Sequence, residues 1–284
     1  MSSDFLQQMA TSSRDRVQTA RRSVSEAALL DLVQSTPPPP VLRQHADGFD
    51  LIAELKLRSP AAGQLKSGDE DVAARVTSYA QAGAAAVSIL TEPSRFDGAL
   101  SHLQTGAQAL GPFCVPAMRK DFLVDPYQVV EARVAGAGGV LVILRMLSQQ
   151  EIDALLERAR ILGLFVLLEA FDERDIEQMH DLVPAHAGSV LLVGVNCRDL
   201  VTLQVVPARL DQLVHLLPTS VPRVAESGVV TAEDARRVAG AGYDLALVGS
   251  ALMQGGDPRG LAGAMLSAGR TARRAGTSSQ LAAR

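Results

Sequence analysis

Several features that direct proteins to membranes, nucleic acids or oxidising compartments are missing from this chain. Its 284 residues include no Trp, 4% aromatic residues and two cysteines, Cys114 and Cys197, which are too few for a disulfide framework. No run reaches the about 18 apolar residues that a membrane-spanning helix needs, and the polar segment 1–22 lacks the apolar core of a secretory signal. The formal charge of −4 offers no basic field for nucleic acid. We therefore expect a cytoplasmic protein that binds neither membrane nor nucleic acid.

Signals for metals and bound cofactors are also missing. The five histidines are scattered, and no two have the spacing of metal ligands. No Gly-x-Gly-x-x-Gly fingerprint and no Walker loop occurs. We expect a site without a metal or a bound cofactor.

Eight short apolar runs recur along the chain and provide its strongest signal. They begin 23 to 34 residues apart, the spacing of repeated strand–helix units. The runs cover residues 51–56, 85–90, 114–118, 139–144, 164–169, 190–195, 222–226 and 245–249. Eight such units predict a closed (β/α)8 barrel, whose active site lies at the C-terminal ends of its strands.

Helical patterns fill the segments between these runs. Several begin with Asp, Ser or Thr and end with Gly, as helix caps do. They cover residues 68–83, 125–138, 148–163, 172–183, 207–217 and 231–242. An apolar stripe over residues 14–34, ended by the prolines of 36–40, predicts an extra N-terminal helix.

These patterns divide the chain into three parts. We expect residues 1–48 to form a helical extension that packs on the barrel and residues 49–268 to form the catalytic barrel itself. The length and the 47% hydrophobic content suit one barrel of about 250 residues with short additions. The segment 269–284 is small, polar and basic, which predicts a flexible tail.

Charged residues end the first, third and fifth strands. Glu54 and Lys56 are two residues apart, so they share the inward face of the first strand. Two charges that point into the barrel cost free energy unless they pair with each other. Glu54 and Lys56 are therefore either a pair that works in the active site or a buried ion pair that only closes the end of the barrel. Lys120 has the parity of an inward residue, although a solvated loop lysine is equally compatible with this segment. Glu169 closes an apolar run as an inward carboxylate, and Asp172 suits the cap of the next helix better.

The segment 193–200 ends the sixth strand with polar residues. Asn196 can donate and accept hydrogen bonds with a substrate hydroxyl. We interpret Arg198 and Asp199 as a structural pair that holds the loop. Cys197 has no neighbouring base, so we interpret it as a packing residue rather than a nucleophile.

Glycine and serine follow the seventh and eighth strands. At such places backbone N–H groups face the site where a helix begins, and many barrels bind phosphate there. Ser59, after the first strand, is near enough to add a hydroxyl group. We therefore predict a phosphate site formed by Ser59, Gly228, Gly249 and Ser250.

These segments together resemble the indole-3-glycerol-phosphate synthase family. The matching segments are 52–63, 87–100, 116–129, 167–172, 193–200, 224–229 and 247–253, which follow the family's order at seven of eight strand ends. The resemblance implies a carboxy-lyase of tryptophan biosynthesis. Its substrate would be 1-(2-carboxyphenylamino)-1-deoxyribulose 5-phosphate, and its products indole-3-glycerol phosphate, carbon dioxide and water.

The resemblance also implies a role for each candidate residue. Lys120 would be the general acid and Glu169 the general base, while Lys56 would hold the substrate carboxylate or act as a further acid. Two nearby lysines would lower each other's pKa, and Glu54, the partner of Lys56, would oppose that shift. The other implied contacts are Asn196 and Ser227 on polar substrate groups, the four phosphate residues above, and an aryl pocket of Phe96, Phe122, Leu141 and Leu200.

The chain departs from the family pattern near the phosphate loop. Where the family reads Ser-Pro-Ser-Lys-Gly, residues 59–63 read Ser-Pro-Ala-Ala-Gly, so a hydroxyl and a cation are missing. Cys197 also stands where the family has a second Asn. Two alternatives therefore stay open. One is another phosphate-binding barrel enzyme, either an isomerase or an aldolase with a Schiff base on Lys56 or Lys120; the other is a catalytically silent barrel used for binding.

Overall fold

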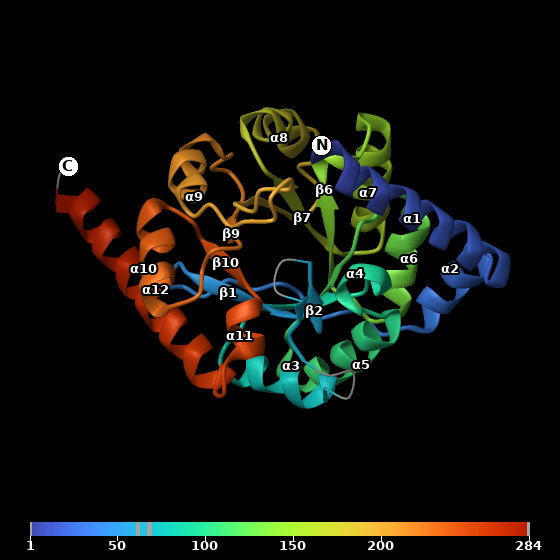
Figure 1. The fold of residues 1–284 in the computed structure, drawn as a ribbon, viewed down its shortest axis with the longest axis horizontal. Helices are drawn as coiled ribbons and strands as arrows, with labels where there is room; N and C mark the ends of the chain where they lie inside the picture. Colours follow the sequence, from blue (N-terminus) through green and yellow to red (C-terminus); the bar gives the residue numbers. More distant parts are fainter. Residues whose placement is uncertain (1, 61–62, 67–69, 283–284) are drawn as a thin grey trace.

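Eight parallel strands close into a barrel at the centre of the structure, a computed structural model that describes residues 2–60, 63–66 and 70–282 (Figure 1). Around the barrel the strands follow the order β1-β10-β9-β8-β7-β6-β5-β4, and β1 pairs with both β10 and β4. The strands are β1 (Asp50–Leu55), β4 (Ala86–Leu90), β5 (Ala117–Lys120), β6 (Gly139–Ile143), β7 (Phe165–Ala170), β8 (Leu191–Asn196), β9 (Arg223–Glu226) and β10 (Leu245–Val248). The predicted (β/α)8 barrel is confirmed.

Strand β5 begins three residues after the start of its apolar run, the largest such difference in the barrel. The third run starts at Cys114, but that residue has a left-handed φ of 54° and ends a short 3-10 helix, η1 (Gly111–Phe113). Pro116 then has no N–H group to donate to a neighbouring strand. Strand β5 therefore starts at Ala117 and runs on to Lys120, which places Lys120 at the end of the strand.

Helices surround the barrel in the expected alternation (Figure 1). They are α3 (Val72–Gln81), α5 (Leu100–Leu110), α6 (Pro126–Val134), α7 (Gln149–Ile161), α8 (Glu173–Ala185), α9 (Ala208–Leu213), α10 (Ala232–Ala241) and α12 (Pro258–Ala282). Short elements after the strands, which the sequence patterns did not predict, are the hairpin β2 (Arg58–Ser59) and β3 (Gly63–Gln64), and the helices α4 (Pro93–Phe96), η2 (Leu144–Met146) and α11 (Ser250–Gln254). The 3-10 helix η3 (Val214–Leu216) continues α9 within the predicted helix 207–217. Within the described residues, no helix combines the length and the apolar character that crossing a membrane requires.

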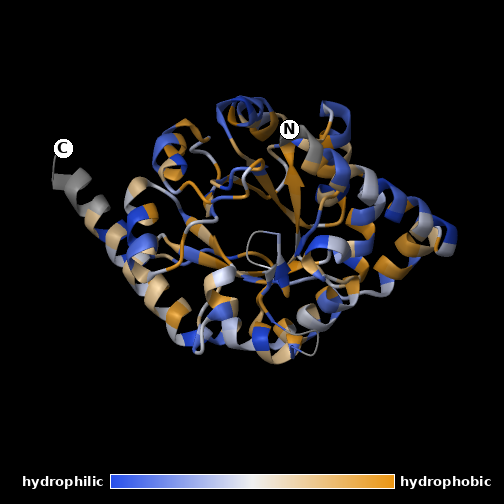
Figure 2. Ribbon diagram, in the orientation of Figure 1, coloured by the Kyte–Doolittle hydropathy of each residue, from blue (hydrophilic) through white to orange (hydrophobic). Residues whose placement is uncertain are grey.

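Two apolar layers hold the barrel together, and Figure 2 shows the strands as its most hydrophobic part. The inner cluster takes residues from all eight strands, among them Ile52, Met118 and Leu192, and only the barrel interior can bring these together. The outer cluster lies between the strands and the helices and includes Ala53 and Leu55. The alternation along β1 therefore places Ile52 and Glu54 inward, as their spacing predicts.

The N-terminal segment forms two helices rather than one. Helix α1 (Ser2–Ser23) and helix α2 (Glu26–Ser35) meet at Ser25, whose hydroxyl caps α2 by accepting from the Ala28 N–H group. Val17 and Leu29 pack with Tyr127 and Val130 of α6, on the outside of the barrel. The other end of α1 supplies Leu6 and Met9 to the inner cluster, so α1 also covers part of the barrel mouth.

The C-terminal segment differs from the predicted flexible tail. Helix α12 continues to Ala282, and the predicted boundary at residue 268 falls inside it. Arg270 pairs with buried Asp50 over 2.9 Å, and Arg273 pairs with Asp244. These ion pairs hold the first turns after residue 268 on the barrel, which a composition rich in Ala, Gly and Arg did not reveal. Residues 283–284 lie outside the described residues.

Candidate active site

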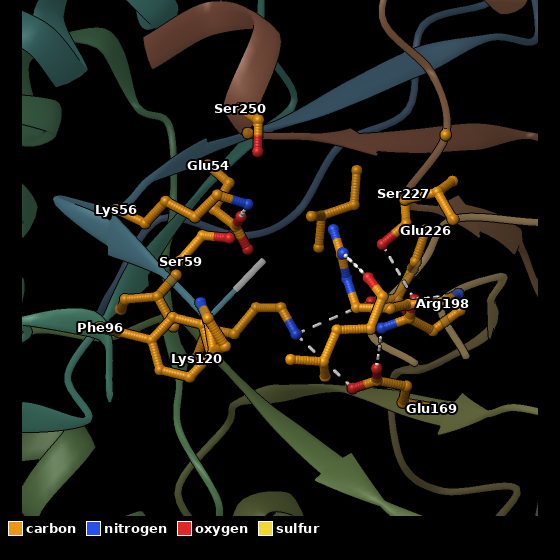
Figure 3. Close-up of a pocket in the computed structure, with 18 of the residues that line it drawn as sticks. Glu54, Lys56, Ser59, Phe96, Lys120, Glu169, Arg198, Glu226, Ser227 and Ser250 are labelled. Atoms are coloured by element: carbon orange, nitrogen blue, oxygen red, sulfur yellow. Dashed lines mark hydrogen bonds and ion pairs between the residues drawn. The ribbon is translucent and has the colours of Figure 1, made fainter. Parts of the chain in front are cut away.

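A cavity of about 350 Å³ opens where the barrel strands end, and every predicted site residue lines it (Figure 3). Charged groups come from β1, β5, β7 and β9, and the polar groups of the loops after β8, β9 and β10 lie around them. Because all parallel strands end at the same side of the barrel, residues distant in sequence converge there. The protein has only three lysines, and two of them, Lys56 and Lys120, line this cavity.

Glu54 and Lys56 form a close ion pair on one side of the cavity. Lys56 Nζ donates to Glu54 Oε1 over 2.6 Å, and their side chains are 12% and 3% exposed, respectively. Both side chains follow Ile52 on the inward face of β1, so their spacing placed them correctly. A Cβ atom on Gly249 would come within 2.8 Å of Lys56 Nζ and closer still to Glu54. Gly249 therefore leaves the space that this ion pair occupies.

Lys120 lies between two buried carboxylates. Its Nζ atom is 3.5 Å from Glu169 Oε2 and 3.9 Å from Glu226 Oε2 (Figure 3). Burial disfavours the charged ammonium, but the attraction of Glu169 and Glu226 outweighs burial and raises the pKa of Lys120. The expectation that two lysines would depress this pKa is therefore wrong for Lys120. The lysine carries its proton in the resting site.

Glu226 is a strand-end residue of the site to which the sequence reasoning assigned no role. It ends β9 with a side chain only 1% exposed, and neither of its carboxyl oxygens has a hydrogen-bond partner among the described residues. Burial and the nearby Glu169 carboxylate together raise its pKa well above the ordinary value, although Lys120 opposes them. A Cβ atom on Gly194 would overlap Glu226 Oε1, so the glycine in β8 makes room for this side chain. The sequence signal for Glu226 was its position as an acidic residue at the end of the seventh apolar run.

A hydrogen-bonded chain orients the other carboxylate. Asn196 Nδ2 donates to Glu169 Oε1 over 2.5 Å, and Ser227 Oγ donates to Asn196 Oδ1 over 2.9 Å. The Arg198 N–H group also donates to Asn196 Oδ1, which fixes the orientation of the amide. Glu169 Oε2 accepts no hydrogen bond from the described residues and faces Lys120. One carboxylate oxygen is therefore held in place while the other is available for proton transfer.

The predicted phosphate residues all line the cavity. Ser59 is buried, Gly228 has a left-handed φ of 72°, and Ser250 begins α11 with its side chain turned toward the cavity (Figure 3). A Cβ atom on Gly228 would lie 3.0 Å from Cys197 Sγ, so any larger residue would be both strained and crowded. Ala61 and Ala62, where the chain departs from the family pattern, lie outside the described residues.

The predicted aryl residues form an apolar wall of the same cavity. The rings of Phe96 and Phe122 are 6.2 Å apart, and Leu141 and Leu200 lie along the same wall. Helix α1 adds Phe5 and Leu6, and Phe5 meets Phe122 edge to face at 5.9 Å. The sequence reasoning missed these two contributions because the expected N-terminal helix began only at residue 14.

Arg198 is a further cavity residue that received no functional role from the sequence, and its predicted pairing is wrong. Asp199 pairs with Arg209 over 3.1 Å, whereas Arg198 Nη1 donates to the Leu203 carbonyl over 2.6 Å and Arg198 lines the cavity. The guanidinium is therefore available to a substrate anion. Cys197 is fully buried, and burial raises the pKa of its thiol to about 11, as suits the predicted packing role.

Sequence comparison identifies the family. The sequence profile described as Indole-3-glycerol phosphate synthase matches residues 6–262. The chain belongs to this family. Relatives named indole-3-glycerol phosphate synthase include those from Parafrankia sp. (44% identical, covering 87% of this chain and 90% of the relative) and Nocardioides sp. (42%, covering 82% and 85%). A relative of the same name from Opitutus terrae is 38% identical and covers 91% of this chain and 97% of its own length.

Solved structures of low sequence identity share only the fold with this indole-3-glycerol phosphate synthase family member. The thiamine phosphate pyrophosphorylase from Pyrococcus furiosus has a TM-score of 0.56 at 16% identity and covers 80% of this chain and 98% of its own. The 3-hexulose-6-phosphate synthase from Salmonella typhimurium has a TM-score of 0.60 at 14% identity and covers 80% of this chain and 99% of its own.

The described residues hold no group of three or more His, Cys, Asp or Glu side chains placed to bind a metal ion.

Proposed function

We propose that this protein is an indole-3-glycerol phosphate synthase that closes, decarboxylates and dehydrates 1-(2-carboxyphenylamino)-1-deoxyribulose 5-phosphate. The observation that carries the proposal is the position of Lys120, 3.5 Å from Glu169 and beside an apolar wall, in a chain of this family. An ammonium and a carboxylate at this distance supply the acid and the base that the reaction requires. The reaction would take place in the cytoplasm, where free thiols such as Cys114 and Cys197 stay reduced.

Lys120 would act first, in ring closure. The aryl carbon that bears the carboxylate attacks the ribulose carbonyl, and the carbonyl oxygen takes a proton as the bond forms. Because this oxygen becomes an alkoxide, which is a strong base, a lysine of raised pKa can still protonate it. The Glu169 carboxylate, 3.5 Å away, keeps Lys120 charged until then. The ring is left as a cationic imine, which accepts the electrons released when carbon dioxide leaves, so no cofactor is required.

Glu169 would act in the final dehydration. A base removes a proton from the intermediate while an acid protonates the departing hydroxyl group, which leaves as water. The oxygen of Glu169 that accepts no hydrogen bond from the described residues can act as this base, and Asn196 holds the other oxygen. Lys56, tied to Glu54, is the second ammonium in the cavity and can serve as the further acid or hold the substrate carboxylate.

The remaining groups would orient the substrate. We assign the phosphate to the loops of Ser59, Gly228, Gly249 and Ser250, and the aryl ring to the wall formed by Phe96, Phe122, Leu141 and Leu200. Asn196 and Ser227 are assigned to substrate hydroxyl groups. Arg198 adds a permanent positive charge to the cavity, which can compensate for the cation that the loop after β1 lacks relative to the family pattern.

One assay tests the proposal directly. Purified protein is mixed with the carboxyphenylamino ribulose phosphate, and the fluorescence of the indole product is followed with time. We expect turnover that depends on enzyme concentration, and product identified by mass. Absence of indole product would refute the proposed activity. Borohydride added during turnover provides a second test, because a covalent adduct on Lys56 or Lys120 would indicate an aldolase instead.

A further inference from the structure

A carboxylate next to Lys120 connects the barrel to helix α1. Asp121 directly follows Lys120, and its side chain is fully buried. Arg16 of α1 donates to both of its oxygens, with Nη2 2.8 Å from Oδ1 and Nη1 3.0 Å from Oδ2. The two parallel hydrogen bonds fix the relative orientation of both groups, which a single contact would not do. Arg16 is 27% exposed at its side chain, so this link is only partly open to solvent.

The barrel supplies the other partners of Asp121. Arg119 Nη2 and Thr91 Oγ1 donate to Oδ2 over 3.2 and 2.7 Å, and the Phe122 N–H group donates to Oδ1 over 2.8 Å. Burial opposes the charged carboxylate, but the two arginines outweigh it and hold the pKa of Asp121 well below its usual range. The carboxylate is therefore charged, and Arg16 provides one of the two guanidinium groups that balance it.

A second contact from α1 reaches the same short segment. Ser13 Oγ donates to the Phe122 carbonyl over 2.5 Å, and Gln128 Nε2 donates to Ser13 Oγ over 2.9 Å. Ser13 and Arg16 are three residues apart and therefore lie on one face of the helix. Helix α1 thus contacts the two residues that follow Lys120, one through its side chain and one through its carbonyl group.

We propose that Arg16 is a positioning residue, which holds the end of β5 so that Lys120 stays aligned with Glu169. This inference rests on the proposed function for its effect on rate. Lys120 and Asp121 share a peptide bond, so a shift of the Asp121 carboxylate moves the base of the lysine side chain. The lysine has no hydrogen-bonding partner on α1 in the described residues, so the polar contacts of the helix reach it through Asp121 and Phe122.

Replacement of Arg16 by Ala tests the proposal against a matched control. Arg14, two residues earlier on α1, also pairs with the barrel, over 2.9 Å to Glu151 at the start of α7. R14A therefore removes an ion pair between α1 and the barrel without touching the end of β5. We expect R16A to lower kcat about 10- to 100-fold with KM changed less than about twofold, as a misplaced catalytic group does. R14A should keep wild-type kcat.

Two further measurements separate positioning from general stability. Hydrogen exchange of the segment 119–125 should be faster in R16A than in wild type or R14A, because its amide groups lose their anchor. Guanidinium at millimolar concentration should restore part of the kcat of R16A and leave R14A unchanged, since the site of Arg16 is partly open to solvent.

The outcomes are distinct. A loss of kcat in R16A no larger than in R14A, unchanged exchange of residues 119–125, or no recovery with guanidinium would each overturn the proposal. A wild-type protein that is inactive on the substrate would instead refute the proposed function. In that case the exchange experiment still decides whether Arg16 holds the end of β5.

Discussion

Glu169 Oε2 lies 3.5 Å from Lys120 Nζ, with no hydrogen bond of its own from the described residues. The proposed base and the proposed acid are thus immediate neighbours, whereas the other oxygen of Glu169 is held by Asn196. A proton can pass between the two groups without a large movement of either. Removal of one group should therefore affect the reaction without loosening the barrel around it.

Replacement of Lys120 by Ala should lower kcat by about 10²- to 10⁴-fold, the range that a general acid contributes. Lys66, which does not line the cavity, is the matched control, and K66A should retain wild-type kcat. Steady-state kinetics on the carboxyphenylamino ribulose phosphate measure the effect, and far-UV circular dichroism checks the fold. Normal turnover by K120A would rule out Lys120 as the acid.

The two carboxylates beside Lys120 should respond differently to amide substitution. E169Q removes a proposed base and should lower kcat by at least about 100-fold with little change in KM. Glu226 is not a proposed base, and E226Q keeps a side chain of the same shape beside Lys120, so E226Q should lower kcat less than about tenfold. Equal losses in the two variants would contradict this division of roles.

Glu226 should also make the stability of the protein depend on pH. Its pKa is raised in the folded state, so the folded protein holds a proton that the unfolded chain releases above about pH 4.3. The free energy of unfolding then falls as pH rises toward the folded pKa, by up to about 1.4 kcal/mol per pH unit. The E226Q variant lacks this contribution, so its melting temperature should increase relative to wild type as the pH rises above about 5.

Other shifted groups do not produce the same difference. The stabilising contribution of Lys120, whose pKa is raised, is fully present below about pH 10. Asp121, whose pKa is lowered, loses its contribution only in acid, below about pH 4. Thermal melts of both proteins across the pH range measure the difference. A constant gap in melting temperature would mean that Glu226 titrates normally.

The phosphate assignment can be tested with glycines that share a backbone conformation. Gly228 and Gly163 have φ angles of 72° and 69°, but a Cβ atom on Gly163 would meet nothing within 4 Å. Both G228A and G163A should lose about 1 kcal/mol of stability from the left-handed backbone. Only G228A should raise KM, by about tenfold or more, and weaken inhibition by inorganic phosphate. A KM raised equally in both variants would place the phosphate elsewhere.

The sequence was sufficient for the architecture of the barrel, because each strand coincides with most of a short, mainly apolar run between helical patterns. It failed at the ends of the chain. Helix α1 reaches back to Ser2 because Phe5, Leu6 and Met9 pack at the barrel mouth, and a weak amphipathic pattern gives no information about that partner. The segment after residue 268 is held by Arg270 and Asp50, which are distant in sequence.

In the site, parity along a strand predicted the inward position of Glu54, Lys56 and Lys120 correctly. Arg198 was assigned to the wrong partner because adjacent opposite charges suggest a pair, whereas the loop turns Asp199 toward Arg209. The direction of the pKa shift of Lys120 was also not predicted, since it depends on Glu169 and Glu226, which two other strands bring beside the lysine. Which carboxylates surround an ammonium is decided by the closure of the barrel and not by local sequence.

The small number of lysines makes the cavity unusually easy to monitor by protein chemistry. Apart from the N-terminal amine, Lys66 is the one primary amine of the sequence that does not belong to the cavity. A reagent that acylates amines would therefore report occupancy of the site through the mass of the intact protein. Because the raised pKa of Lys120 keeps its amine protonated, Lys56 is the cavity amine that such a reagent would modify, and its protection by a bound phosphorylated ligand would reveal binding even in a variant that has lost all turnover.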